Sequence, residues 1–184
     1  VCIDNPGVRS ILPRVNKKVV TYGFGEEADY CAENKRYDKH IMKFDVTHKG
    51  QLLGTISLHV PGTHNVLDAL AATVTALYCG ISFPVIQEAL DAFRGVHRRF
   101  ETKAFIDGVW IIDDYAHHPT EIEATLKAAK EIGGYRVICA FQPHRYSRTK
   151  LLQDEFAVAF DSADVLYFTD IYAASEHALP GVDG

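Results

Sequence analysis

The chain has 184 residues, of which 47% are hydrophobic and 23% are charged, and its formal net charge is -5. This composition is typical of a globular protein with one sizeable core or two smaller ones. The acidic balance, without any block rich in lysine or arginine, argues against nucleic acid or an anionic membrane surface as the main partner. Anionic ligands would therefore need local basic pockets.

The four cysteines are widely spaced and form no CxxC pair, which is typical of a reducing compartment. Cys79 and Cys139 stand in apolar runs that predict buried thiols. The sequence has neither an apolar span of about 18 residues nor a signal-peptide pattern, so we expect a cytoplasmic protein without a membrane partner. It begins as though inside a strand and stops without a closing element, so we expect a piece of a longer protein.

The first part of the chain predicts a strand, a helix, a second strand and a β-hairpin. Residues 1–4 and 17–24 read as strands, and residues 6–15 read as a helix that begins at a proline. Residues 41–60 place alternating apolar positions on both sides of Lys49-Gly50. This pattern predicts a hairpin that turns at those two residues.

Two helices follow the hairpin, because apolar residues recur there at spacings of three and four. They are expected at residues 64–80, where Gly80 is a natural stop, and at residues 84–93. The side chains predicted to face inward are Leu67, Leu70, Ala71, Val74, Leu77, Tyr78, Val85, Ile86, Ala89, Leu90 and Phe93. Gly95 marks the expected domain boundary.

The second half alternates strands and helices. Strands are expected at residues 109–113, 135–141 and 164–170, with helices at 119–132 and 148–163 between them. The inward side chains of the helices are expected to be Ile122, Leu126, Ala129, Leu152, Phe156 and Phe160. Short loops between alternating elements indicate parallel βαβ units with right-handed crossovers, hence an α/β fold.

Polar residues gather in the three segments that follow these strands, at residues 113–119, 142–148 and 170–176. In an open parallel sheet, ligands bind beyond the carboxyl ends of the strands. Binding residues also concentrate on loops held by a rigid scaffold. We therefore expect a functional site on this edge, in preference to three solvated loops.

A metal site is one interpretation of this edge. The candidate ligands are His117, His118 and His144 with Asp113 or Asp114. Adjacent histidines diverge on most backbones, and no HExxH or paired Cys/His spacing is present, so we expect no metal site. A nucleophilic hydrolase is also disfavoured, because there is no G-x-S-x-G elbow and Ser147 reads as a helix-start residue.

Four arginines have both a binding and a structural interpretation. Arg145 and Arg148 open a helix after a strand and suit a carboxylate or phosphate, although they are also plausible surface ion pairs. Arg98 and Arg99 lie at the expected domain junction on opposite faces, where one can touch a polyphosphate or form a salt bridge.

His64 and Asn65 stand at a helix start after Gly62. Asparagine is a good N-cap on general grounds, and that role alone would explain Asn65. An exposed amide at this place can also read the edge of a purine.

Taken in order, "PGTHNVLDALAA", "GVHRRFE", "IIDDYAHHPTEI" and "FQPHRYSRT" resemble the motifs of the Mur ligases, and "LPRVNKKVVTYGFGEEADYCAEN" is similar to the family's central domain. The resemblance spans nearly the whole chain. It implies that residues 1–96 are the C-terminal part of a P-loop-type central ATP-binding domain. Residues 97–184 would be an incomplete Rossmann-like C-terminal domain with a mostly parallel sheet that binds amino acid and nucleotide.

The family reaction uses ATP and Mg²⁺ to phosphorylate a carboxylate, after which an amine attacks the acyl phosphate. The resemblance is greatest to members that add L-alanine to UDP-N-acetylmuramate in peptidoglycan synthesis, so the expected partners are these two substrates and ATP. The family's UDP-sugar domain is absent from the 184 residues, and so is any G-x-x-x-x-G-K-[ST] stretch. We therefore expect the chain alone to be inactive.

The matching motifs imply roles on the nucleotide side. His64 and Asn65 would contact adenine, and Arg99 would reach the ATP phosphates. Asp113 or Asp114 would hold the ribose hydroxyls, with the motif alignment favouring Asp113. Two positions depart from the family pattern and weaken these assignments: Asp68 replaces a frequent asparagine, and Thr63 a common arginine.

The resemblance also implies an alanine pocket formed by Tyr115, His117, Arg145 and Arg148, in which the arginines grip the carboxylate. It assigns neither a catalytic residue nor a metal ligand. A ligase that recycles murein tripeptide shares the "DD-aromatic-AHHPT" pattern, but "RRFE" and "FQPHRYSRT" favour the alanine-adding members. A metal-dependent hydrolase and a non-catalytic binding fragment remain alternatives from other classes.

Overall fold

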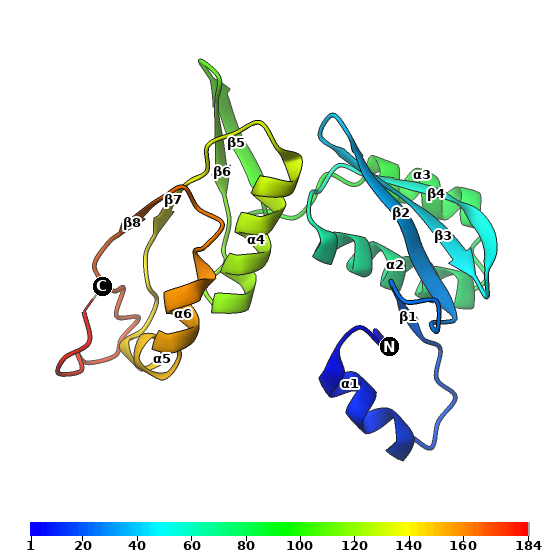
Figure 1. Cartoon of the computed structure of the whole chain (residues 1–184), viewed down its shortest axis with the longest axis horizontal. Helices are drawn as coiled ribbons and strands as arrows, with labels where there is room; N and C mark the ends of the chain where they lie inside the picture. The colour runs from blue at the N-terminus through cyan, green and yellow to red at the C-terminus, as the bar shows by residue number, and fades with distance from the viewer. Residues whose placement is uncertain (184) are drawn as a thin grey trace. The chain divides into compact units, whose positions relative to one another are not determined.

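The computed structural model describes residues 1–183 (Figure 1). Its contacts divide the chain into two compact units, of which the first is Val1–Gly95 and the second begins at Val96. Within residues 1–183, none of the helices has the length and apolarity needed to cross a bilayer.

The first unit is built on a four-stranded sheet. Its strands, in the order β1-β2-β3-β4, are β1 (Tyr22–Gly23), β2 (Tyr30–Asp38), β3 (Ile41–His48) and β4 (Gln51–Leu58). β1 and β2 are parallel, and the other pairs are antiparallel. Two helices pack against this sheet. Helix α2 (Thr63–Tyr78) contacts β1 and β2, and helix α3 (Phe83–Ala92) contacts β4.

The predicted hairpin is confirmed, with its turn at Lys49 and Gly50. Their φ angles of 51° and 78° are the left-handed values that a tight two-residue hairpin turn requires, and glycine adopts them without steric cost. Gly54 in β4 permits a close approach of α3, because a Cβ there would lie 2.8 Å from Cε1 of Phe83. Helix α3 therefore approaches β4 where the strand has no side chain.

The amino-terminal prediction is partly wrong. The predicted strand at residues 1–4 is reduced to an isolated bridge between Cys2 and Tyr22. The predicted helix divides into α1 (Pro6–Ile11) and a 3-10 turn (Leu12–Arg14), because Pro13 has no amide hydrogen to continue the α-helical ladder. Strand β2 was not predicted, since its residues are largely polar and its register shifts between Glu33 and Arg36.

The core of the first unit lies between the sheet and α2. Phe44, Val46 and Ile56 from the sheet are fully buried against Val66 and Leu70 of α2. The predicted inward face of α2 is rotated, because its buried residues are Val66, Ala69, Leu70 and Thr73. Among the residues predicted to be inward, Tyr78 is 77% exposed, and Val85 and Phe93 are also exposed. Cys79 ends α2 and is exposed, so the prediction of a buried thiol was wrong there.

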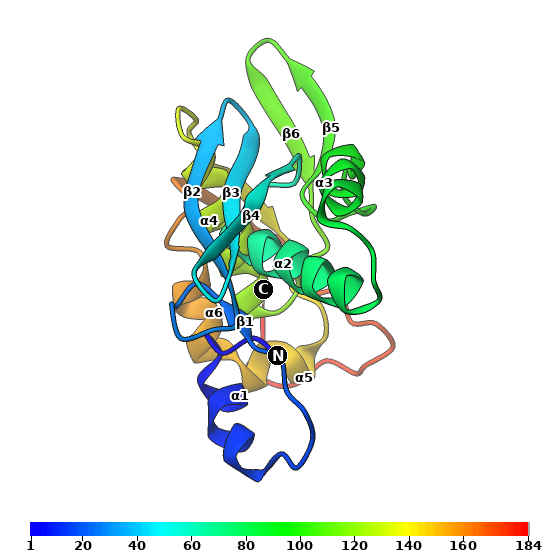
Figure 2. The ribbon, with the colours of Figure 1, turned by 90° about the vertical axis from the view of Figure 1, so that its right-hand side faces the viewer.

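The second unit has an antiparallel hairpin followed by alternating helices and strands. The hairpin pairs β5 (Glu101–Ile106) with β6 (Val109–Asp113), and it is seen as a two-stranded ribbon in Figure 2. The elements after it are α4 (Pro119–Ile132), β7 (Ile138–Phe141), α5 (Tyr146–Leu151), α6 (Gln153–Ala159) and β8 (Val165–Phe168). β7 and β8 are parallel, which confirms an α/β fold with parallel strands.

Three details of the second unit differ from the prediction. β5 was not predicted, and the ladder of β6 is antiparallel to β5, whereas a parallel neighbour was expected. The helix predicted at residues 148–163 is interrupted at Leu152, whose ψ of 24° departs from helical geometry. Its second half still packs as expected, because Phe156 and Phe160 join Ile122 and Leu126 in the core.

Phe44→Ala should destabilise the first unit by about 3–5 kcal/mol, because Phe44 is fully buried and its removal leaves a cavity. Urea unfolding followed by circular dichroism measures the change. Leu52→Ala in the neighbouring strand is the control, because Leu52 is 61% exposed. Equal losses of stability in the two variants would contradict the assigned core.

Candidate functional site

The segments after β6, β7 and β8 meet in the second unit. The rings of His117 and His144 have centroids 6.3 Å apart, and His144 stacks on Tyr172 at 5.5 Å. Tyr172 donates its amide hydrogen to the carbonyl of Pro143 at 2.8 Å and accepts one from the amide of Arg145 at 2.8 Å. The carboxyl ends of the strands thus bring side chains from all three segments together.

We call Tyr115, His117, His144, Arg148 and Tyr172 the strand-end cluster. Tyr115 and His117 are in edge-to-face contact with ring centroids 5.1 Å apart. Nη1 of Arg148 lies 3.3 Å from Nδ1 of His144. The cluster therefore combines aromatic rings, two imidazoles and a guanidinium, a set suited to a small polar ligand with an anionic group.

The surroundings of His144 favour the neutral form of its ring. Burial lowers the pKa of His144 first, and the positive charges of Arg148, Arg145 and His117 lower it further, while Glu176 opposes them. A neutral Nδ1 accepts the hydrogen bond that Arg148 donates. The positive charge beside His144 is therefore that of Arg148, within the cluster, and of the neighbouring Arg145.

Arg145 and Ser147 begin α5. Arg145 has a φ of 75°, which is an uncommon value for a residue other than glycine. Ser147 donates both its amide and its hydroxyl hydrogen to Glu176, at 2.9 and 2.5 Å. Its contacts are those of the helix-start residue that the sequence predicts.

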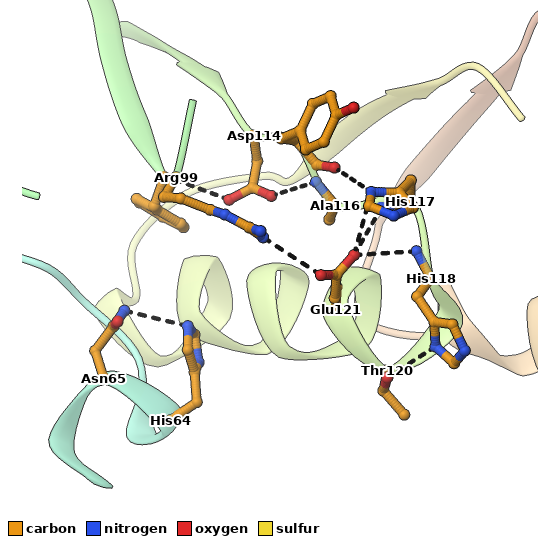
Figure 3. A network of polar contacts seen from close by, with 11 residues as sticks. His64, Asn65, Arg99, Asp114, Ala116, His117, His118, Thr120 and Glu121 are labelled. Carbon is orange, nitrogen blue, oxygen red and sulfur yellow. Dashed lines mark hydrogen bonds and ion pairs between the residues drawn. The ribbon is translucent and has the colours of Figure 1, made fainter. Parts of the chain in front are cut away.

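Glu121, in the first turn of α4, is a site residue that the sequence reasoning missed (Figure 3). Its Oε2 accepts hydrogen bonds from the amides of His117 and His118, at 3.1 and 3.2 Å. Its Oε1 lies 3.5 Å from Nη1 of Arg99. A capping-box spacing, in which a glutamate stands three residues after the N-cap His118, is the signal that would have found it.

The environment of Glu121 keeps it ionised. Burial raises the pKa of Glu121, but the hydrogen bonds from His117 and His118, with the nearby charges of His117 and Arg99, outweigh burial and hold the pKa below its usual value. One carboxylate therefore connects the loop before α4 with Arg99.

Asp113 and Asp114 differ sharply in their surroundings. Asp114 accepts hydrogen bonds from the amides of Phe100, at 2.8 Å, and Ala116, at 2.7 Å (Figure 3). Asp113 lies 3.4 Å from Nε of Arg98 and 3.8 Å from Nζ of Lys103, both of them partly exposed contacts. Asp114 thus fixes the backbone, whereas the side-chain contacts of Asp113 within residues 1–183 are surface ion pairs.

A strained turn at residues 97–100 orients the two adjacent arginines. Arg98 and Phe100 have φ angles of 56° and 44°, and Glu101 accepts the amide hydrogen of Arg98 at 2.8 Å. A hydrogen bond with Lys103, followed by that amide, lowers the pKa of Glu101 to about 2. The guanidinium of Arg98 lies 4.8 Å from the ring centroid of Tyr115, while Arg99 faces Glu121, so the expected divergence is present.

His64 and Asn65 lie in the first unit, in the first turn of α2. Nδ2 of Asn65 donates to the carbonyl of Pro61 at 2.6 Å and lies 3.1 Å from Nε2 of His64. The N-cap is Gly62 with a φ of 104°, so the N-cap role considered for Asn65 was wrong. Thr63 accepts a hydrogen bond from Lys35 at 3.2 Å.

Family comparisons cover most of the chain. Residues 1–76 match the middle domain of the Mur ligases, and residues 98–182 match the family's glutamate ligase domain. The chain belongs to the Mur ligase family.

Its relatives include a UDP-N-acetylmuramate--L-alanine ligase of Anaeromyxobacter dehalogenans strain 2CP-C, which is 49% identical over 98% of this chain and 40% of the relative. The chain thus spans about 40% of the length of such relatives.

Two solved structures extend the comparison. A UDP-N-acetylmuramate-alanine ligase from Thermotoga maritima matches with a TM-score of 0.66 and 34% identity, over 82% of this chain and 39% of that one. A murein peptide ligase from Psychrobacter arcticus matches with a TM-score of 0.54 and 28% identity, over 88% of this chain and 34% of that one. Of these two structures, the UDP-N-acetylmuramate-alanine ligase has the higher sequence identity to this chain.

Asp114→Ala should destabilise the second unit by about 1–3 kcal/mol, because it leaves the amides of Phe100 and Ala116 without their acceptor. The adjacent Asp113→Ala removes surface ion pairs alone and should cost less than about 1 kcal/mol. Urea unfolding of both variants measures the difference. A larger loss in the Asp113 variant would refute the roles assigned here.

Proposed function

We propose that the chain is part of an ATP-dependent ligase that joins L-alanine to UDP-N-acetylmuramate in peptidoglycan synthesis, a reaction placed in the cytoplasm. The observation that carries the proposal is the 49% identity to ligases of that name over 98% of the chain. The strand-end cluster supports it, because its groups suit an amino acid. Residues 1–96 would then complete an ATP-binding domain, and residues 97–184 would supply most of the domain that presents the amino acid.

ATP would supply the phosphoryl group that activates the muramyl carboxylate as an acyl phosphate. Within residues 1–183, no group of three or more side chains could ligate a metal ion by itself. The Mg²⁺ of the family reaction would be held largely by the phosphates of ATP, where it would neutralise their charge. What this chain contributes is binding and orientation. Holding amine and acyl carbon together removes much of the entropic barrier to their reaction.

On the amino-acid side, Arg148 and Arg145 would bind the carboxylate of alanine. Arg148 is already oriented through its contact with His144, and Arg145 is held through its amide. Tyr115 and His117 would form the other wall, with Tyr115 oriented by the guanidinium of Arg98. A guanidinium matches a carboxylate with two parallel hydrogen bonds, which fixes the direction of the amine.

On the nucleotide side, His64 and Asn65 would contact adenine, and Arg99 would contact the phosphates. Both oxygens of Asp114 are occupied by backbone amides. This supports Asp113 as the residue that would hold the ribose hydroxyls.

The murein peptide ligases are the second candidate within the family. Their solved representative is 28% identical to this chain, compared with 34% for the alanine ligase structure. A metal-dependent hydrolase and a non-catalytic binding fragment have no comparable support from the relatives.

The test is an assay of the full-length protein that contains this chain, with ATP, UDP-N-acetylmuramate and L-alanine. We expect phosphate release that depends on both substrates, and a product larger by one alanine in mass spectrometry. The 184 residues alone should not turn over ATP, because they contain no G-x-x-x-x-G-K-[ST] stretch to cradle its phosphates. A full-length protein that joins tripeptide but not alanine would disprove the proposed function. ATP hydrolysis by the pure 184-residue chain would disprove the prediction that this chain alone is inactive.

Arg148→Ala in the full-length protein should raise the KM for alanine by about 10- to 100-fold, which is the range for losing a hydrogen bond to a charged group. The KM for ATP should change much less. Steady-state kinetics with each substrate varied measure both constants. Lys150→Ala is the control, since Lys150 is an exposed cation of the same helix. If the KM for ATP increased and the KM for alanine did not, Arg148 would lie outside the amino-acid pocket.

A further inference from the structure

We propose that Glu121 is a positioning residue that holds His117 as the proton acceptor for the incoming amine. The inference rests on the proposed function, because it assigns a role within the amino-acid pocket. It is carried by the hydrogen bonds around the His117 ring and around the Glu121 carboxylate.

The tautomer of the neutral His117 ring follows from its neighbours. Its Nδ1 lies 2.9 Å from the carbonyl oxygen of Tyr115 and 3.5 Å from Oε2 of Glu121. A carbonyl and a carboxylate are acceptors only, so Nδ1 must carry the hydrogen. In the neutral ring, Nε2 then has the free lone pair.

Nε2 is the nitrogen left for a ligand. Among the described residues 1–183, the polar contacts of this ring are made through Nδ1. The side chain of His117 is 32% exposed. A lone pair that is oriented by the backbone and accessible from solvent is suited to accept a proton from a bound ammonium group.

The Glu121 carboxylate is itself fixed in three directions. Oε2 accepts the amide hydrogens of His117 and His118, and Oε1 faces Arg99 at 3.5 Å. These contacts turn Oε2 toward the imidazole and keep the carboxylate ionised. An ionised carboxylate beside Nδ1 stabilises the imidazolium that forms when Nε2 takes a proton.

The other groups that face His117 are the ring of Tyr115, 5.1 Å away, and the imidazole of His144, 6.3 Å away. Arg148 lies behind His144, with which it is in contact. Arg148 disfavours a second positive charge nearby. Within residues 1–183, the carboxylate in contact with the His117 ring is that of Glu121.

The ammonium of alanine transfers one proton to Nε2, which leaves a neutral amine and an imidazolium. The amine lone pair then forms the C–N bond with the acyl carbon, and the C–O bond to phosphate breaks with its electron pair leaving on phosphate. The second proton lost by nitrogen passes to the departing phosphate or to water, and the imidazolium later returns its proton to water.

The first experiment compares Glu121→Gln with Glu123→Gln in the full-length protein. The glutamine oxygen can still accept the amide hydrogens that cap α4, but the charge beside His117 is lost. Glu123 lies on the same helix and pairs with Lys127 at 2.5 Å, so its variant controls for charge loss on α4. Melting temperatures close to that of the Glu123 variant would show that the cap is retained.

We expect Glu121→Gln to lower kcat by up to about 100-fold, the lower end of what general acid–base catalysis contributes. The acid limb of the kcat-pH profile should move to lower pH, because the protonated ring loses its stabilising anion. His117→Gln should abolish that limb. Glu123→Gln should leave both kcat and the limb unchanged. If the acid limb lay at the same pH in Glu121→Gln and Glu123→Gln, the proposal would be overturned.

The second experiment needs no variant of Glu121. Long-range proton-nitrogen correlation spectra of the 184-residue chain, labelled with ¹⁵N, report which imidazole nitrogen carries hydrogen, and His117→Gln assigns the signals. We expect hydrogen on Nδ1 and a bare Nε2 in the neutral ring. The opposite tautomer would refute the inference even if the full-length protein joins alanine. If the protein does not join alanine, the proposed function fails while the spectra still establish the tautomer.

Discussion

The hydrogen bonds that two backbone amides donate to Asp114 organise the second unit. The amides of Phe100 and Ala116 come from segments on either side of the β5–β6 hairpin, and both end on this carboxylate. The amide of Tyr115 adds a bond to the carbonyl of Arg98. Because the turn and the loop are joined in this way, Arg98 is held against Tyr115 and Arg99 is directed to the opposite side. Glu121 then fixes the end of this loop next to α4, through the amides of His117 and His118.

Much of the fold was predictable where a local signal is strong. The helix at residues 119–132 was predicted with its observed ends, because a proline opens it, apolar residues recur along it and glycines follow. β2 and β5 were missed, because their polar residues hide the alternation that marks a strand. The interruption at Leu152 was missed because amphipathic periodicity continues through it. These features depend on tertiary contacts that a local pattern does not contain.

The site followed a similar division. The rule that ligands bind beyond the ends of parallel strands placed Tyr115, His117 and Arg148 in neighbouring segments, and the structure links them through His144. The contrast between Asp113 and Asp114 was not predictable, because it depends on which carboxylate meets the amide of Phe100. The contacts of Glu121 with the His117 amide and with Arg99 were not predictable, because they depend on the tertiary structure, although its spacing from His118 indicates a cap.

The close approach of α3 to β4 over Gly54 has a consequence for how the first unit tolerates change. Helix α3 can lie this close to β4 because Gly54 has no Cβ atom. A single methyl group at that position would enter the space of the Phe83 ring and displace the helix from the layer beneath it. The middle of β4 is therefore least permissive at its smallest residue, whereas the bulky Leu52 nearby, open to water, is free to vary.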